Sequence, residues 1–359
     1  MYRAWLFFSL FGPTGTSQTS QVKEETVNFY RSIVYLCTFL VLSACGGGGG
    51  GGGGNGGNNN PPPDPTLTLD QQVRNAIAAA GLTGDPTEGR ALPSINDPLA
   101  QLGKKLFFSK SLSGDMDTAC ASCHHPALGG ADGLSLPVGV GAVDPDVVGP
   151  GRTRDDGLPN VGRHSQSVFN GGLFDAGLFW DSRVESIGKE ANMNGAGSGI
   201  RTPETALNVE DAGAGPNLVA AQARIPVTIP SEMRGSLLPG ATEQQVREHL
   251  AARIGDYGSG QGELTNNNWL AEFQAAFASA DTAENLVTFE NIAIAIGEYQ
   301  RSMVFIDTPW KAYVEGDNNA ISALAKEGAL LFFGDASDGI VECVQCHSGD
   351  FFTDEDHHT

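Results

Sequence analysis

The chain has 359 residues, including 48 glycines and 19 prolines, and a formal net charge of -21. Its length allows two domains of ordinary size, and its composition predicts a globular body with loop-rich stretches. The excess of acidic residues argues against nucleic acid as a partner, because the phosphates would be repelled. The same charge would steer a basic protein partner toward the surface, although a solvated acidic surface without a partner is the simpler explanation.

Residues 1–44 have the pattern of an export signal. The apolar run at 32–42 is too short to span a bilayer but has the length of a secretory signal core. The run ends in Leu42-Ser43-Ala44-Cys45, which resembles a bacterial lipoprotein box. The resemblance implies cleavage before Cys45 and a lipid anchor on its sulfur. An ordinary secretory signal cleaved nearby is the alternative.

Residues 45–68 are predicted to be a linker. Nine glycines at 46–54 favour a flexible coil, and the prolines that follow favour a stiffer spacer. A lipid anchor followed by such a flexible linker predicts a globular body held at a membrane, in the periplasm or at the cell surface. Residues 1–30 precede the apolar run, whereas a signal usually begins close to its apolar core. One hypothesis is therefore that translation begins at an alternative start codon, at Val22 or Val27.

Cysteine spacing is the most specific feature of the sequence. Two of the six cysteines lie at the signal segment, and the other four form two C-x-x-C pairs, each followed directly by histidine. A c-type haem is attached through two thioether bonds, and the histidine after the second cysteine coordinates the iron. The sequence therefore predicts two covalently bound haem c groups, and zinc binding is the alternative. The predicted haem-binding residues are Cys120, Cys123, His124, Cys343, Cys346 and His347, with His124 and His347 as iron ligands.

An internal repeat precedes the two motifs. Residues 99–108 and 324–333 are both apolar at helical spacing, and each is followed by a loop and then C-x-x-C-H. This pattern predicts a mainly α fold with two cytochrome-c-like haem domains, at residues 69–287 and 288–359. Residues 126–163 are expected to be loop, and the sequence contains no convincing set of strands.

The second haem domain is expected to be incomplete. Only 12 residues follow His347, which is too few to enclose both faces of a haem. The chain is therefore predicted to be C-terminally truncated, with the distal ligand of the second haem beyond Thr359. Met303 is expected to be a core residue rather than a replacement ligand.

Seven short segments follow one another in a characteristic order: Leu102–Phe108, Cys120–His124, Leu178–Arg183, Ile229–Met233, Phe289–Ala293, Glu315–Asp317 and Cys343–His347. In combination they resemble the bacterial di-haem cytochrome c peroxidases. That family includes the di-haem enzyme that matures methylamine dehydrogenase by oxidising tryptophans. The resemblance runs from about Asp97 to the end of the chain.

The resemblance implies an enzyme that reduces hydrogen peroxide with electrons from a small donor protein of the cytochrome c or cupredoxin type. The haem on His124 would react with peroxide, and the haem on His347 would receive electrons. Trp180 matches a tryptophan between the haems, where an indole can relay an electron; a packing aromatic is the alternative. Glu232 matches an acid near the peroxide site, where a carboxylate can act in general acid–base catalysis; a surface glutamate is the alternative. Glu190 falls where relatives carry a glutamine and is a third catalytic candidate.

Three departures from the family pattern bear on function. Gly139-Val140-Gly141 stands where relatives place a switchable histidine between two glycines, so the first haem is expected to be open without reductive activation, unless His125 or His164 reaches it. His164 also stands where relatives place an asparagine that helps to hold calcium. Imidazole is a poor ligand for this hard cation, so calcium is left open rather than expected. Residues 191–228 look like a loop-like insertion that shapes access to the site.

Two further functions remain as alternatives to a peroxidase. One is a di-haem enzyme that oxidises aromatic residues of a partner protein, and the other is a pure electron-transfer cytochrome. An open iron on the first haem argues against pure electron transfer.

Overall fold

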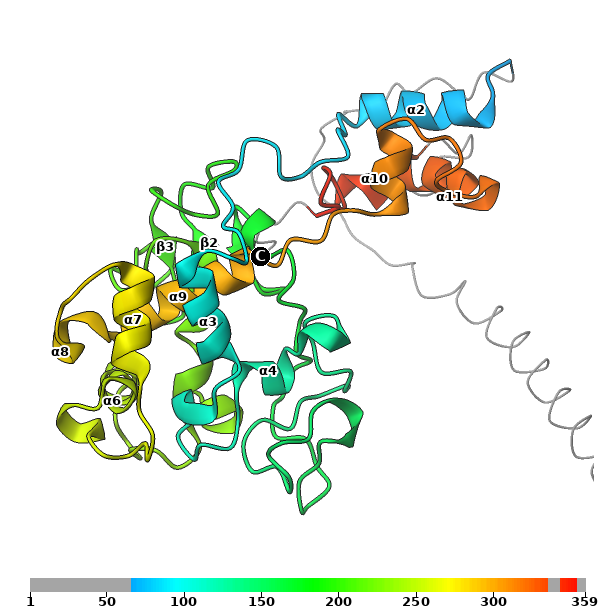
Figure 1. The fold of residues 1–359 in the computed structure, drawn as a ribbon. Coiled ribbons are helices and arrows are strands. Elements are labelled where there is room, and N and C mark those ends of the chain that lie inside the picture. Colours follow the sequence, from blue (N-terminus) through cyan, green and yellow to red (C-terminus); the bar gives the residue numbers. More distant parts are fainter. Residues whose placement is uncertain (1–65, 335–342, 354–359) are drawn as a thin grey trace, which may run out of the picture. The chain divides into compact units, whose positions relative to one another are not determined.

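The computed structural model describes residues 66–334 and 343–353, so the predicted signal segment and most of the predicted linker lie outside the described residues. The described part is mainly helical, as the sequence predicts (Figure 1). Its helices are α2 (Leu69–Ala79), α3 (Pro98–Phe107), α4 (Cys120–Cys123), α5 (Leu218–Ala223), α6 (Glu243–Gly255), α7 (Trp269–Phe277), α8 (Ala283–Leu286), α9 (Phe289–Arg301), α10 (Pro309–Val314) and α11 (Ala323–Phe333).

A small antiparallel sheet corrects the expectation that strands are absent. Its strands, in the order β1-β2-β3, are β1 (Gly177–Leu178), β2 (Val184–Ser186) and β3 (Ile200–Arg201). Leu178 pairs with Val184, and Ser186 pairs with Ile200. Strands of two or three residues are too short to show an alternating pattern, so the sequence gives no signal for them.

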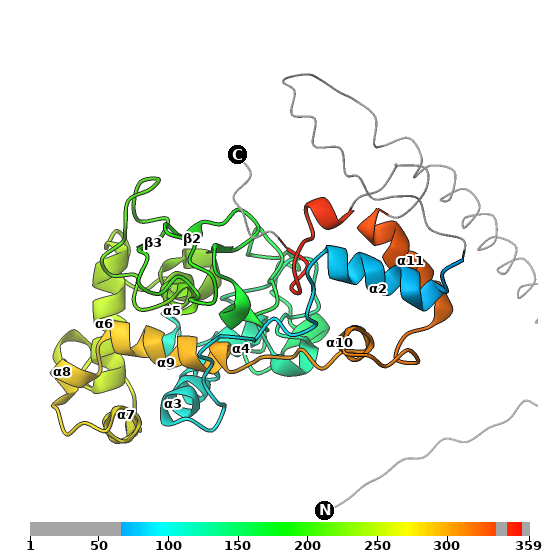
Figure 2. The ribbon, with the colours of Figure 1, turned by 90° about the horizontal axis from the view of Figure 1, so that it is seen from above.

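The main core forms where α3 packs against α9 (Figures 1 and 2). Helix α3 begins at Pro98, whose fixed φ suits a first helical position, and ends with two lysines in its last turn. A Cβ on Gly103 would lie 1.8 Å from the carbonyl oxygen of Ala295, so glycine allows the two helix backbones to meet. The buried apolar faces of α6 and α7 complete this core.

Helix α9 belongs to this core and begins after Thr288, whose side chain caps it by accepting a hydrogen bond from the Asn291 backbone. Ile292, Ile296 and Tyr299 lie at helical spacing and are buried. Met303 lies just beyond the end of α9 and is also buried, which confirms it as a core residue. The predicted domain boundary between residues 287 and 288 therefore falls inside one core.

The stretch 191–228 is not a simple loop, because it contains β3 and the buried helix α5. Asn217 caps α5 by accepting a hydrogen bond from the Ala220 backbone. Leu218 and Val219 pack with the apolar side chains of the sheet. A Cβ on Gly297 of α9 would lie 3.0 Å from the Ala220 backbone, so α5 and α9 also meet closely. The expectation of a loop-like insertion is corrected for this part of the stretch.

A further cluster joins α2 with α10 and α11. Val73 and Ile77 of α2 are buried against Tyr313 and Phe333. The Tyr313 hydroxyl donates to Asp70, which also pairs with the Lys326 ammonium at 2.7 Å. A helix that precedes the first haem motif thus packs with the helices that precede the second.

The remaining expectations concern loops and membrane spans. Residues 126–163 are loop apart from two short 3₁₀ turns, as predicted. Among residues 66–334 and 343–353, no helix has both the length and the apolar character that a bilayer crossing requires.

The repeat supplies a matched test of the α3–α9 contact, because Gly103 and Gly328 occupy the same place in its two copies. Gly103→Ala should destabilise the protein by about 1–3 kcal/mol, since the added methyl group meets the Ala295 carbonyl. Gly328→Ala should be neutral or stabilising by up to about 1 kcal/mol, because nothing lies within 4 Å and alanine favours a helix. Denaturant unfolding of the two variants measures the difference; equal effects would contradict this account of the packing.

Candidate functional site

The first haem motif forms one helical turn at the wall of a cavity. Helix α4 contains both cysteines, and the Ala119 backbone N–H donates to the Ser122 hydroxyl at its start. A spacing of three residues places Cys120 and Cys123 on one side of this turn. Burial raises the pKa of the Cys120 thiol to about 12 and that of Cys123 to about 11, so both sulfurs remain protonated near neutral pH.

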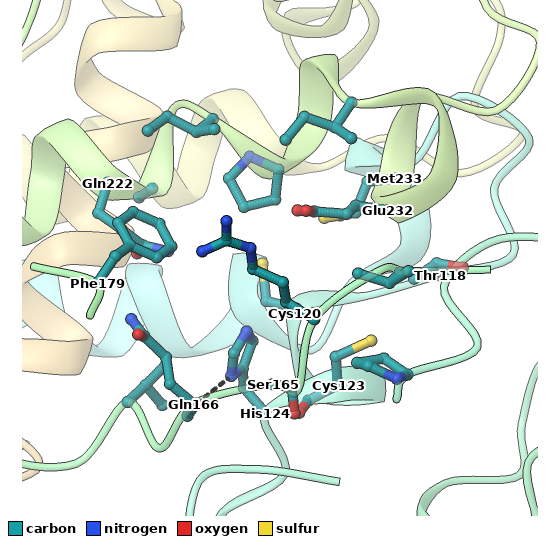
Figure 3. Close-up of a pocket in the computed structure, with 18 of the residues that line it drawn as sticks. Thr118, Cys120, Cys123, His124, Ser165, Gln166, Phe179, Gln222, Glu232 and Met233 are labelled. Carbon is teal, nitrogen blue, oxygen red and sulfur yellow. Dashed lines mark hydrogen bonds between the residues drawn. The ribbon is translucent and has the colours of Figure 1, made fainter. Parts of the chain in front are cut away.

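His124 is oriented by two backbone carbonyls. Its Nδ1 lies 2.9 Å from the Gln166 oxygen and 3.2 Å from the Gly130 oxygen (Figure 3). A carbonyl oxygen can only accept, so Nδ1 carries the proton and Nε2 keeps its lone pair. Burial lowers the pKa of His124, which also favours the neutral ring. A neutral imidazole with a free Nε2 beside two thiols fits a covalently attached haem.

The cavity next to these residues has a volume of about 380 Å³ and a mostly apolar wall. Helices α3, α4, α5 and α9 contribute to the wall, together with loop residues 161–168 and a short π-helix, η7 (Pro230–Arg234). An apolar cavity with a few convergent polar groups is typical of a cofactor site. The predicted residues that line it are Cys120, Cys123, His124, Trp180 and Glu232.

Glu232 enters the cavity from η7. The backbone N–H groups of Arg234 and Gly235 bond to oxygens five residues earlier, which makes this turn wider than an α-helical one. In Figure 3, the Glu232 carboxylate and the His124 ring approach the drawn pocket from different walls. Burial raises the pKa of Glu232 to about 7, and the nearby Arg183 partly opposes the rise.

Trp180 lies at the exposed edge of the cavity, with 78% of its surface accessible. The Arg163 guanidinium carbon lies 4.7 Å from the centre of its ring, a cation–π arrangement. Asp181 pairs with Arg163 and Arg183, and Arg183 lies over the ring of Phe179. Arg163 thus lies over the ring of Trp180, and Arg183 lies over the ring of Phe179, at this edge of the cavity.

Glu190 and Gln222 differ from the expectation for this site. Glu190 is exposed and is not among the residues that line the cavity, so its catalytic role stays a prediction. Gln222, ten residues before Glu232, is buried and lines the cavity, although the sequence did not single it out. The Asn217 cap and the alanine-rich run after it are the only sequence signal for this helix.

Three residues bear on whether a histidine could reach the first haem: Val140, His164 and His125. Val140 is buried and does not line the cavity. His164 lines it, and its Nδ1 lies 2.8 Å from the Leu134 oxygen. His125 does not line the cavity and packs against Phe108. In the described part of the chain, no three His, Cys, Asp or Glu side chains gather as metal ligands would.

The second motif repeats part of this arrangement. Helix α11 is followed by a 3₁₀ turn, η9 (Cys343–Gln345), and Nδ1 of His347 lies 3.1 Å from the Phe352 oxygen. The histidine of the second motif is thus oriented by a backbone carbonyl, like His124 of the first. The side chains packed around this motif are Trp310, Phe332, Phe333, Val344 and Phe352.

The raised pKa of Glu232 predicts a pH-dependent stability. The folded chain holds this proton more tightly than the unfolded chain, so the stability associated with Glu232 is complete below about pH 4.5 and is lost as the pH rises through 7. Glu232→Gln should match the wild type at pH 4.5 and exceed it by on the order of 2 kcal/mol at pH 8, after allowance for solvent in the cavity. Guanidinium unfolding of the haem-loaded proteins tests this; a difference that does not vary with pH would refute it.

Comparisons with known proteins identify a family and several relatives. The family described as "Di-haem cytochrome c peroxidase" matches residues 97–319. Methylamine utilization protein MauG of Methylorubrum extorquens is 29% identical over 72% of this chain and 51% of its own length. Cytochrome c551 peroxidase of Pseudomonas aeruginosa is 28% identical over 73% of this chain and 54% of its own length.

The chain thus spans about half the length of these two relatives. Among solved structures, the di-haem peroxidase BthA of Burkholderia thailandensis matches 75% of this chain and 56% of its own, at 21% identity and a TM-score of 0.42. The family match covers more than half of the chain and includes the first haem motif, Trp180 and Glu232. The chain belongs to the di-haem cytochrome c peroxidase family.

Proposed function

We propose that this protein is a peroxidase that reduces hydrogen peroxide to two molecules of water. The reaction takes up two protons, and a small donor protein supplies the two electrons. A donor of the cytochrome c or cupredoxin type fits this role. The observation that carries the proposal is the shared cavity, which is lined both by Glu232, with its pKa raised to about 7, and by His124, with its free Nε2. The relative named cytochrome c551 peroxidase supports the same chemistry by name.

Two haem c groups are the proposed cofactors, each in a cytochrome-c-like domain. Cys120 and Cys123 would hold the first through thioether bonds, with His124 on the iron; Cys343, Cys346 and His347 would hold the second. When bound, the haems supply the redox change that peroxide reduction needs. The apolar wall around His124 would exclude water from the buried face of the first.

Glu232 would move the proton during peroxide reduction. An ionised carboxylate accepts a proton from the oxygen of peroxide that stays bound and returns it to the oxygen that leaves as water. A pKa of about 7 suits both steps, since the group is neither too weak as a base nor too weak as an acid. Gln222 has an amide in the same cavity and would orient peroxide by donating a hydrogen bond.

Trp180 would carry electrons toward this site, because an indole ring can lose and regain an electron.

The first haem would be open to peroxide without reductive activation, since Val140 replaces the switchable histidine and lies outside the cavity wall. His164 lines the cavity and is the alternative ligand. A high-spin ferric spectrum that responds to peroxide supports an open iron, whereas a low-spin spectrum lost in His164→Ala would contradict it.

Oxidation of aromatic residues in a partner protein is the second candidate. The exposure of Trp180 favours it, because an exposed redox-active ring can exchange electrons with a docked protein. MauG of Methylorubrum extorquens is as similar to this chain as the peroxidase relative. Rapid turnover of peroxide with reduced cytochrome c favours the peroxidase, and slow turnover with oxidation of a partner favours the alternative.

The proposed place of action is the periplasm or cell surface. Thioether attachment of haem needs exported thiols, and residues 1–44 have the pattern of a lipoprotein signal with Cys45 as the anchor site. The signal pattern and Cys45 lie outside the described residues. Mass spectrometry of the exported protein, looking for an acylated N-terminal Cys45, tests the anchor directly.

Glu232→Gln tests the proposed chemistry. The amide cannot accept the proton, so the peroxide reaction should slow by about 10²–10⁴-fold while haem content is unchanged. In the wild type the rate should rise as the pH passes through about 7, since the ionised form is the base, and the variant should lose this dependence. Stopped-flow mixing with peroxide measures both. Glu88→Gln, at an exposed glutamate that does not line the cavity, is the control and should keep the wild-type rate. Unchanged kinetics in Glu232→Gln would remove Glu232 from the mechanism.

A further inference from the structure

The turn that carries Glu232 packs against the loop 137–141, which has no role in the proposed reaction. Gly139, in the loop 137–141, has φ +65°, and a Cβ on it would lie 2.0 Å from the Ser231 oxygen. The backbone N–H of Val140 donates to that same oxygen at 3.3 Å, and the Asn160 side chain donates to it at 3.0 Å. The loop backbone therefore rests directly on the residue before Glu232.

Arg152 holds this loop in place through hydrogen bonds from its buried guanidinium. Its side chain is only 2% exposed, and its Nη2 donates to the Gly139 oxygen at 2.9 Å and to the Thr118 hydroxyl at 3.2 Å. Its Nη1 donates to the oxygens of Pro145 and Val147, both at 3.1 Å. A planar guanidinium can satisfy several acceptors in fixed directions, which an ammonium cannot. The bond to Thr118 joins the loop to the segment that leads into Cys120.

The opposite side of the turn is held as closely. The Gly114 backbone N–H donates to the Met233 oxygen at 2.7 Å, and a Cβ on Gly114 would lie 1.8 Å from the Arg234 oxygen. Gly114 lies six residues before Cys120 in the chain. Both supports of the Glu232 turn are thus tied to the segment that bears the first haem motif.

We propose that Gly139 and Arg152 are positioning residues for Glu232, because the loop that they hold fixes the π-helical turn at a set distance from the haem-bearing segment. The inference rests on the proposed acid–base role of Glu232 but concerns its placement. Neither residue is among those that line the cavity, so neither touches a molecule bound there directly. Gly139 reaches the site through its contact with Ser231, and Arg152 reaches it through its bonds to the Gly139 oxygen and to Thr118. The loop that carries Val140 in place of a histidine thus serves as a fixed brace for the acid.

Gly139 and Gly141 provide a matched pair of variants. Both have positive φ, +65° and +76°, so alanine introduces similar backbone strain at each. Nothing lies within 4 Å of a Cβ on Gly141, whereas a Cβ on Gly139 meets the Ser231 oxygen. Gly139→Ala should therefore displace the turn, and Gly141→Ala should only lower the melting temperature. Arg152→Gln loosens the loop without a clash, and serves if Gly139→Ala fails to load haem.

The readout is the protonation of Glu232 itself, followed by infrared difference titration of the haem-loaded full chain. The carboxylic acid band of Glu232 is assigned by its loss in Glu232→Gln. In Gly139→Ala and Arg152→Gln the pKa of Glu232 should fall toward its ordinary value, because water enters between loop and turn, and the pH profile of the peroxide reaction should shift with it. Gly141→Ala should keep the wild-type titration.

The titration separates this inference from the proposed function. An unchanged Glu232 titration in both Gly139→Ala and Arg152→Gln, or an equal shift in Gly141→Ala, would overturn the positioning role. If the wild type shows no peroxide turnover but the titrations differ as expected, the proposed function fails and the positioning role stands. Haem content by pyridine haemochrome confirms that each variant is loaded.

Discussion

The protonation of one imidazole is the constraint on which the rest of the structure depends. In the proposed function His124 binds iron through the lone pair of Nε2, which requires its proton to stay on Nδ1. The carbonyls of Gly130 and Gln166 hold it there, and these residues come from loops on the two sides of a long irregular stretch. The loop region therefore has to fold back onto α4, and the packing of α3 against α9 supplies the rigid wall on which it does so.

Burial shifts the pKa values of His124 and Glu232 in opposite directions. It lowers the pKa of the histidine and raises that of the glutamate, so it favours the neutral form of both. In the proposed function the neutral histidine would bind the iron, whereas a glutamate with a pKa near 7 can exchange its proton during a reaction. One apolar wall thus serves both roles, because loss of solvation always disfavours the charged form.

The errors of the sequence-based expectations have physical causes. Gln222 was missed because its helix has only six residues, too few for a helical period to stand out within a glycine-rich stretch. The catalytic role of Glu190 stays a prediction; this side chain is exposed, and Gln222 of α5 supplies a different polar side chain to the cavity wall. The domain boundary at 287/288 also stays a prediction, although the helix after it packs closely on α3 where Gly103 meets Ala295.

The sequence by itself determined the chemistry that depends on residues close together in the chain. Two thiols and an imidazole within five residues predict covalent haem at each motif, and the helical spacing at 99–108 and 324–333 predicts helices α3 and α11. Only the tertiary structure decided what faces the first motif. Glu232 lies more than a hundred residues from His124, and it reaches the same cavity because glycines at 114 and 139 let two loops close on its turn. Such contacts depend on backbone approach, which no local pattern of side chains records.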